Sequence, residues 1–306
     1  MTSASDGGPA VEDFYAGLVR HRLIIPAGVD GAFGRGAAFE RVLEAFNSLV
    51  SRVAEHDGAE FCTFPPVIDR SILERVHYMD SFPDLCGAVC SFFGKEAAAR
   101  ELSERIHAGK PWGDALEMTR VVLSPAACYP LYPTLTGTMP VGGRVVTMLN
   151  WVFRHEPSRD PTRMQSFRVR EFVRIGAMEE VIAWRDLWLA RGLDLLSSLG
   201  LDVQSDVASD PFFGRGGKMM AMNQRDQKLK YEVLVPIDRP ERTAVCSFNF
   251  HQQHFGSTFE ILTPDGEAAH TACLGFGLER VVMALFKAHG FEVDRWPSAV
   301  QRRLWP

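Results

Sequence analysis

Six arginines lie within 21 residues of a chain that is acidic overall: Arg154, Arg159, Arg163, Arg168, Arg170 and Arg174. Successive side chains of a strand alternate between two faces, so Arg163, Phe167 and Glu171 share one face. An arginine, an aromatic ring and a carboxylate on one face can hold a phosphate, a stacked base, and an amine or a metal ion. The segment therefore predicts a nucleotide site, with solvated edge charges as the alternative.

A second candidate is the segment Gly275-Phe276-Gly277, which stands directly before a predicted helix with Arg280 in its first turn. Two glycines at a helix entry can cradle a phosphate, because the free N–H groups there attract anions. The third glycine and the preceding βαβ pattern of a dinucleotide fingerprint are missing, so close packing is the alternative. A cation at a helix N-terminus opposes the helix dipole, and we therefore expect Arg280 to have an anionic partner.

Hydrophobic periodicity predicts the elements that must position these residues. Two β-rich segments, 144–156 and 167–175, flank a polar loop and predict a hairpin that carries the arginines. We expect one antiparallel sheet flanked by helices, an α+β fold, in a single domain over 13–306 after a flexible tail at 1–12. The other expected elements are helices at 36–56, 178–199 and 278–289, two short helices within 93–116, and strands at 60–64, 231–236, 243–250 and 257–262.

Composition excludes several classes of protein. The 306 residues are 46% hydrophobic, enough for a large core, and the net charge of −5 argues against binding nucleic acid by overall positive charge. Six scattered cysteines are too few for a disulfide scaffold and predict a reducing compartment with metal-bound or buried thiols. The pairs Cys86/Cys90 and His251/His254 show no third metal ligand. Without a secretory signal or a membrane-spanning apolar run, we expect a soluble cytoplasmic protein that binds no membrane.

Several segments resemble motifs of the class II aminoacyl-tRNA synthetases, in the order and rough spacing of the seryl branch. This resemblance covers about residues 36–290 and implies a class II catalytic domain. The matching segments are FCTFPPVI at 61–68 for motif 1, FRHE at 153–156 with RMQSFRVRE at 163–171 for motif 2, GFGLER at 275–280 for motif 3, and KYEVLVP at 230–236 for a strand of the seryl enzymes.

The segment that would bind the amino acid differs from that of the bacterial seryl enzymes. Where those carry a Thr-x-Glu that holds the substrate, this chain reads Ala126-Ala127-Cys128. In this it is similar to the zinc-dependent seryl enzymes of methanogens, in which two cysteines and a glutamate bind the metal. The matching positions, Cys128, Glu171 and Cys273, imply one zinc ion per chain with a fourth position open for substrate. Simple burial of the two thiols is the alternative.

The resemblance also implies how ATP binds. Arg154 and Arg280 are the expected catalytic residues, because they would neutralise charge on the α- and γ-phosphates. Arg163 is expected to reach the γ-phosphate side of ATP, and Phe167 to stack on adenine, whose amino group donates to Glu156. Mg²⁺ accompanies ATP, and its two candidate ligands are Glu232 and Glu241.

Only 65 residues precede Pro66, too few for the N-terminal tRNA-binding domain of a seryl synthetase. The chain thus resembles the amino acid:[carrier protein] ligases, truncated class II homologues. This resemblance implies ATP-dependent activation of a small amino acid as its adenylate and transfer to the phosphopantetheine thiol of a carrier protein. Glycine or alanine is the expected amino acid, with serine as the rival. The alternatives are a zinc-dependent seryl-tRNA synthetase-like enzyme that acts on tRNA, and a non-catalytic paralogue. Apart from the first alternative, tRNA is not an expected partner.

Two surfaces are expected to meet protein partners. Motif 1 implies a homodimer through the helix at 36–56 and the strand at 60–66. A carrier protein is usually acidic, and the segment 214–230 offers it a basic docking face, with a flexible solvated loop as the alternative. Its charges are Arg215, Lys218, Arg225, Lys228 and Lys230 against Asp226.

Overall fold

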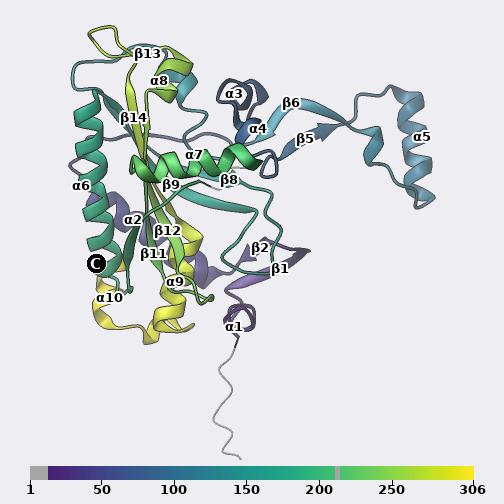
Figure 1. The fold of residues 1–306 in the computed structure, drawn as a ribbon. Helices are drawn as coiled ribbons and strands as arrows, with labels where there is room; N and C mark the ends of the chain where they lie inside the picture. Colours follow the sequence, from purple (N-terminus) through teal and green to yellow (C-terminus); the bar gives the residue numbers. More distant parts are fainter. Residues whose placement is uncertain (1–12, 211–213) are drawn as a thin grey trace, which may run out of the picture.

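A seven-stranded sheet forms the body of the computed structural model (Figure 1), which describes residues 13–210 and 214–306 without the side chains of 214–217. The tail expected at 1–12 lies outside the described residues. All neighbouring strands of this sheet are antiparallel except β3 and β8, a parallel pair that corrects the expectation of a purely antiparallel sheet. From edge to edge the strands are β10 (Gln204–Val207), β11 (Lys230–Val235), β12 (Thr243–Gln252), β14 (His270–Gly277), β9 (Ser166–Gly176), β8 (Arg144–Phe153) and β3 (Glu60–Cys62).

One face of the central strands carries polar side chains, because residues opposite one another in a ladder share a face. Glu171 on β9 lies opposite Gly275 on β14, which lies opposite Ser247 on β12. Two residues away on β14, Cys273 lies opposite Asn249 on β12. Residues far apart in the sequence are thereby aligned side by side.

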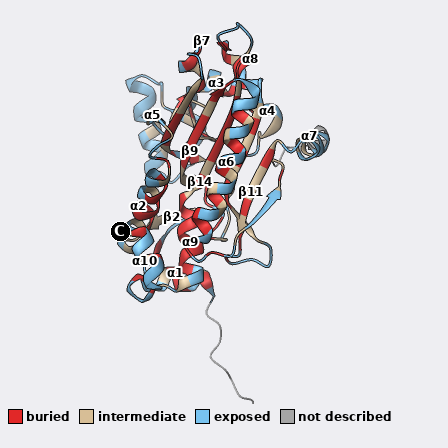
Figure 2. Ribbon diagram, turned by 90° about the vertical axis from the view of Figure 1, so that its left-hand side faces the viewer, coloured by how far each residue is buried: buried red, intermediate tan, exposed pale blue. Residues whose placement is uncertain are grey.

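The other face is covered by helices α6 (Met178–Ser197) and α9 (Leu278–His289), with α2 (Ala37–Val53) packed against α9 (Figure 2). Phe172, Phe248 and Leu274 alternate with the polar residues of the same strands and are fully buried on this side, together with Trp188 of α6. Burial of each such side chain contributes about 1.5–3 kcal/mol. The larger core therefore lies between the sheet and these helices, and a second buried cluster, which includes Val173, Ile175 and Tyr132, packs on the other face beside the polar residues.

A second, three-stranded sheet extends from the body as an arm, at the right in Figure 1. Its strands, in the order β4 (Val67–Asp69), β6 (Glu117–Leu123) and β5 (Ala88–Ser91), lead to α5 (Glu96–His107), none of whose residues is buried. The remaining elements are α1 (Phe14–Arg20), β1 (Ile24–Val29), β2 (Ala32–Arg35), α3 (Arg70–Arg75), α4 (Tyr78–Ser81), the 3₁₀ turns Gly113–Ala115, Tyr132–Leu135 and Val293–Arg295, β7 (Gly137–Thr138), α7 (Gly214–Asp226), α8 (His254–Phe259), β13 (Ile261–Leu262) and α10 (Ser298–Leu304).

The strongly periodic elements match their predictions. The hairpin of β8 and β9 and the helix α6 form within a few residues of the expected ends, and α9 spans the predicted residues 278–289. Along 13–210 and 214–306, no helix combines the length and the apolar character needed to cross a membrane.

Three expectations about the elements are wrong. The strand expected at 257–262 is mostly the helix α8, followed by the two-residue strand β13. The strand β14 was not expected, because its glycines were interpreted as the entry of the next helix. Within 93–116 only α5 is a full helix; the second expected helix is a single 3₁₀ turn, followed by β6.

Candidate active site

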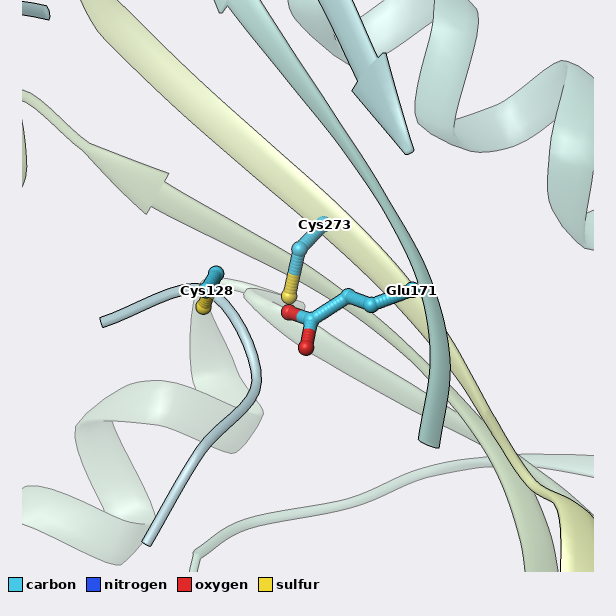
Figure 3. Close-up of side chains that lie close together, drawn as sticks. All are labelled: Cys128, Glu171 and Cys273. Atoms are coloured by element: carbon cyan, nitrogen blue, oxygen red, sulfur yellow. The ribbon is translucent and has the colours of Figure 1, made fainter. Parts of the chain in front are cut away.

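The three expected metal ligands lie together on the polar face of the sheet (Figure 3). One ligating atom from each of Cys128, Glu171 and Cys273 falls within 4.8 Å of the other two, and all three residues are buried. Glu171 comes from β9 and Cys273 from the adjacent β14, whereas Cys128 comes from a turn after β6. The buried amide of Asn150 on β8 fixes this turn, since its nitrogen donates to the Ala127 carbonyl at 3.0 Å.

Burial favours the neutral forms of these three groups when no cation is near. It raises the pKa of Glu171, whereas the hydrogen bonds that the carboxylate shares with the two thiols lower this pKa by a smaller amount. The hydrogen bond to Cys273, followed by burial, raises the pKa of Cys128 well above its ordinary value. The hydrogen bond with Cys128 lowers the pKa of Cys273, but burial and the interactions with Glu171 together outweigh it, and the net shift is upward. A buried divalent cation would reverse all three shifts, and two sulfur ligands with one carboxylate suit zinc.

Polar side chains from β12 and β14 surround Cys273. The amide nitrogen of Asn249 lies 3.4 Å from its sulfur, and Nε2 of His251 lies 3.5 Å from the same atom. The other ring nitrogen of His251 lies 3.0 Å from the Thr271 hydroxyl. Burial lowers the pKa of His251 to about 3, so the ring is neutral.

The pairing of His251 with His254 that the sequence suggested does not form a metal site. His251 lies in the strand β12, whereas His254 begins the helix α8 and is exposed. Of the pair Cys86 and Cys90, Cys90 lies in the strand β5, whereas Cys86 precedes this strand. Sequence reasoning also missed the role of Asn249, although the alternation of Ser247, Asn249 and His251 along β12 was the available signal.

A pocket of about 570 Å³ contains the metal cluster and the expected nucleotide residues. Arg154, Glu156, Arg163, Phe167 and Arg280 all line it, as do Cys128, Glu171 and Cys273. The guanidinium carbon of Arg154 lies 6.0 Å from the centre of the Phe167 ring, and Arg163 approaches Glu156 at 3.3 Å. One cavity therefore offers both a cluster of cations for phosphates and a set of metal ligands.

The partly buried side chain of Arg280 has partners other than the expected anion. Its Nε donates to the Thr162 carbonyl at 2.8 Å, and its Nη1 donates to the Ala244 carbonyl at 3.0 Å. Burial, followed by the charge of Arg154, lowers the pKa of this guanidinium. Two main-chain oxygens thus fix its plane, while the charges of Glu156 and Glu232 in the same pocket act against the lowering of its pKa.

The arginines on the other face of β9 serve the fold. Arg168 makes two bonds of 2.7 Å to Glu40 of α2, and its Nε donates at 2.9 Å to the fully buried Glu279 of α9. Arg174 pairs with Glu180 of α6 at 2.8 Å. Only part of the arginine cluster faces the pocket, and Arg168 and Arg174 tie helices to the sheet.

Two expectations about charged residues near the pocket are corrected. Lys230, expected on a docking face, is buried on β11, where its ammonium lies 2.6 Å from Asp210 and 3.0 Å from Glu232. The carboxylates of these two partners neutralise it, so it offers no free charge to a protein. Of the two candidate magnesium ligands, Glu232 lines the pocket, whereas Glu241 is exposed and does not.

The rest of the expected docking face belongs to α7. Lys218, Arg225 and Lys228 are exposed there, whereas the side chain of Arg215 lies outside the described residues. Gln224 of α7 accepts from the Asp210 backbone at 2.7 Å and donates to its carboxylate at 2.9 Å. This contact holds α7 over the mouth of the pocket, which its residues Met220, Asn223 and Gln224 line.

Curated proteins resemble the chain over most of its length, although no protein-family model matches it. The amino acid--[acyl-carrier-protein] ligase 2 of Bradyrhizobium diazoefficiens is 45% identical over 280 residues, which cover 90% of this chain and 84% of that protein. Ligase 1 of the same organism is 40% identical and covers 98% of this chain and 93% of its own length. The type-2 serine--tRNA ligase of Methanopyrus kandleri is 28% identical over 88% of this chain, which spans only 55% of that protein.

Solved structures resemble the fold. SerRS of M. kandleri, in complex with A. aeolicus tRNASec, matches with a TM-score of 0.82 at 23% identity and covers 98% of this chain and 62% of that chain. Prolyl-tRNA synthetase of Giardia lamblia, in complex with prolyl-adenylate, matches with a TM-score of 0.67 at 16% identity, over 90% of this chain and 51% of that chain. At these identities the likeness concerns the fold alone.

Proposed function

Because the chain belongs to the amino acid--[acyl-carrier-protein] ligases, a family of enzymes, we propose that its pocket activates a small amino acid with ATP and transfers it to a carrier protein. Its fold is that of the class II aminoacyl-tRNA synthetases. The observation that carries the proposal is the pocket itself, in which a buried Cys, Glu, Cys cluster and a group of arginines share one cavity. The intermediate is an aminoacyl adenylate, and the acceptor is a phosphopantetheine thiol.

The nucleotide end of the pocket binds ATP and Mg²⁺. Phe167 stacks on adenine, Glu156 accepts from the adenine amino group, and Arg163 reaches the γ-phosphate side. Arg154 and Arg280 neutralise the charge that develops on the α- and γ-phosphates when the substrate carboxylate attacks the α-phosphorus and pyrophosphate leaves. Both guanidiniums are already oriented by main-chain carbonyls, which removes reorganisation from the barrier.

The metal end binds the amino acid. Cys128, Glu171 and Cys273 hold one zinc ion, and the buried donor set described above fits that ion. Zinc bound there supplies a Lewis-acid position for the α-amine of the substrate. Arg154 lines the same pocket as these three side chains, so it would be available to the carboxylate of an amino acid whose amine the zinc would bind.

The substrate is glycine or alanine, with serine as the main rival. The metal would bind the amine of the substrate and its ligands form one wall of the amino-acid end, which favours a small side chain. Discrimination of a single added group is worth only about 1–3 kcal/mol, so neighbouring amino acids are activated at reduced rates rather than excluded.

The transfer step joins the pocket to the carrier protein. The carrier thiol loses its proton and its sulfur attacks the carbonyl carbon of the adenylate; the bond from that carbon to the phosphate oxygen breaks, and AMP leaves with the electron pair. The exposed charges Lys218, Arg225 and Lys228 of the α7 region lie beside the pocket mouth and suit an acidic carrier.

The chain also forms a homodimer through α2 and β3. The strand β3 is an edge of the large sheet, and its Phe61 is 58% exposed. Light scattering at micromolar concentration is expected to give the mass of a dimer, and a monomer would contradict this part of the proposal.

The function is tested by ATP–pyrophosphate exchange with each amino acid in turn, followed by transfer to a holo carrier, an apo carrier without the arm, and bulk tRNA. We expect exchange with glycine or alanine and loading of the holo carrier alone. Exchange only with bulky or acidic amino acids would refute the substrate assignment. Loading of tRNA instead of the holo carrier would replace the ligase by a synthetase.

A further inference from the structure

Polar side chains outside the ligand set face both sulfur atoms of the metal cluster. Asn249 and His251 lie at 3.4 and 3.5 Å from the sulfur of Cys273. On the other side, the hydroxyl of Tyr132 is fully buried and, among the described residues, has no hydrogen-bond partner. The Cys128 side chain interacts with this hydroxyl and adds to the effect of burial, which raises the pKa of the phenol.

The hydrogen bonds at Cys273 run toward the sulfur. The side-chain nitrogen of Asn249 can only donate. In the neutral ring of His251, one nitrogen carries a proton and the other accepts. The hydroxyl of the buried Thr271 lies 3.0 Å from Nδ1; with this hydroxyl as the donor, the ring proton lies on Nε2 and faces the sulfur. A thiolate accepts both bonds, whereas a protonated thiol accepts them less well.

Tyr132 is held so that its hydroxyl cannot turn to water. Its ring stacks on Phe255 with centroids 3.9 Å apart and an interplanar angle of 8°. It does not line the pocket, and its ring meets that of His251 edge-on, with centroids 6.5 Å apart. A buried hydroxyl without an acceptor is costly, and a thiolate at Cys128 provides the acceptor that this one lacks.

We propose that Tyr132, Asn249 and His251 are positioning residues that donate hydrogen bonds to the two zinc-bound thiolates. The inference rests on the proposed zinc site. Two thiolates and one carboxylate carry three negative charges against the two positive charges of zinc, so the bare site has an excess of negative charge. Hydrogen bonds to sulfur offset this excess, fix the ligands, and preserve the attraction of the metal for the neutral amine of the substrate.

The test compares Tyr132→Phe, His251→Leu and His251→Gln with the wild type. The first removes only a hydroxyl and keeps the stacked ring, whereas glutamine keeps an N–H donor at position 251. Tyr129→Phe is the matched control, since Tyr129 packs on the same Phe255 ring and is the residue next to Cys128. Zinc affinity is measured by competition with a chelator, and the sulfur-to-metal charge-transfer band is recorded after cobalt(II) substitution.

We expect Tyr132→Phe and His251→Leu to weaken zinc binding by about 10- to 100-fold and to move the band to longer wavelength, because sulfur then holds its electrons less tightly. His251→Gln and Tyr129→Phe are expected to stay near the wild type. Unchanged affinity and band in Tyr132→Phe overturn the inference, even where His251→Leu does not fold. A wild-type chain that binds no zinc overturns the proposed metal site as well, which separates the two failures.

Discussion

Replacing Arg280 by alanine tests the proposed chemistry at one defined charge. The guanidinium is fixed by carbonyl oxygens at 2.8 and 3.0 Å, so it is ordered before ATP binds. A preorganised donor to developing charge contributes about 2.7–4 kcal/mol to the transition state, which corresponds to a loss of about 100- to 1000-fold in adenylate formation. Arg280→Lys keeps the charge but lacks the planar fork that holds both carbonyls, and its loss is expected to be intermediate.

Stability should change much less than activity in these variants. Removing Arg280 leaves two carbonyls without a charged donor, but it also removes a partly buried cation whose pKa burial already lowers. These opposing effects predict a change of about 1–2 kcal/mol in the free energy of unfolding. Pyrophosphate exchange is the assay, thermal unfolding reports the fold, and Arg100→Ala, an exposed arginine of α5 outside the pocket, is the control. Exchange within tenfold of the wild type in a folded Arg280→Ala enzyme would refute the assignment.

Three further predictions concern the metal, the pocket wall and the carrier. Cys273→Ala should lose both zinc and activity; full zinc content by elemental analysis would contradict the ligand set. Burial raises the pKa of Asp210, but Lys230 and Gln224 outweigh it and the net shift is downward. The carboxylate should therefore stabilise the fold above about pH 4 and lose that contribution as the pH falls. The loss of unfolding free energy in Asp210→Asn should accordingly be smaller at pH 3 than at pH 7. Carrier loading should weaken steeply with added salt while pyrophosphate exchange hardly responds; equal salt dependence of both would exclude docking by charge.

Local patterns predicted the elements whose signal is dense. The hairpin of β8 and β9 and the helix α9 follow from strong periodicity over about ten residues each. The strand β14 has a pattern as well, since His270, Ala272, Leu274 and Phe276 alternate with smaller or polar residues. Glycines at 275 and 277 hid it, because glycine is depleted in strands and common at helix ends.

Charges were harder to assign, because their partners come from other segments. Counting cations along 214–230 made Lys230 part of a surface, yet Asp210 reaches it from twenty residues upstream and neutralises it. The HxxH spacing likewise carried no information, because His251 and His254 belong to different elements. A pairing that depends on sheet order is invisible until the order of the strands is known.

Glycine at position 275 explains why one sheet face can serve both ends of the pocket. It lies opposite Glu171, beside the metal end, and two residues from Gly277, which precedes the helix of Arg280. A side chain there would rise into the pocket, and even its first carbon would meet Val169 at 3.0 Å. Its role is therefore space rather than an unusual backbone conformation. The bare strand leaves a continuous surface from the metal ligands to Arg280, which the joining of a carboxylate to a phosphate requires.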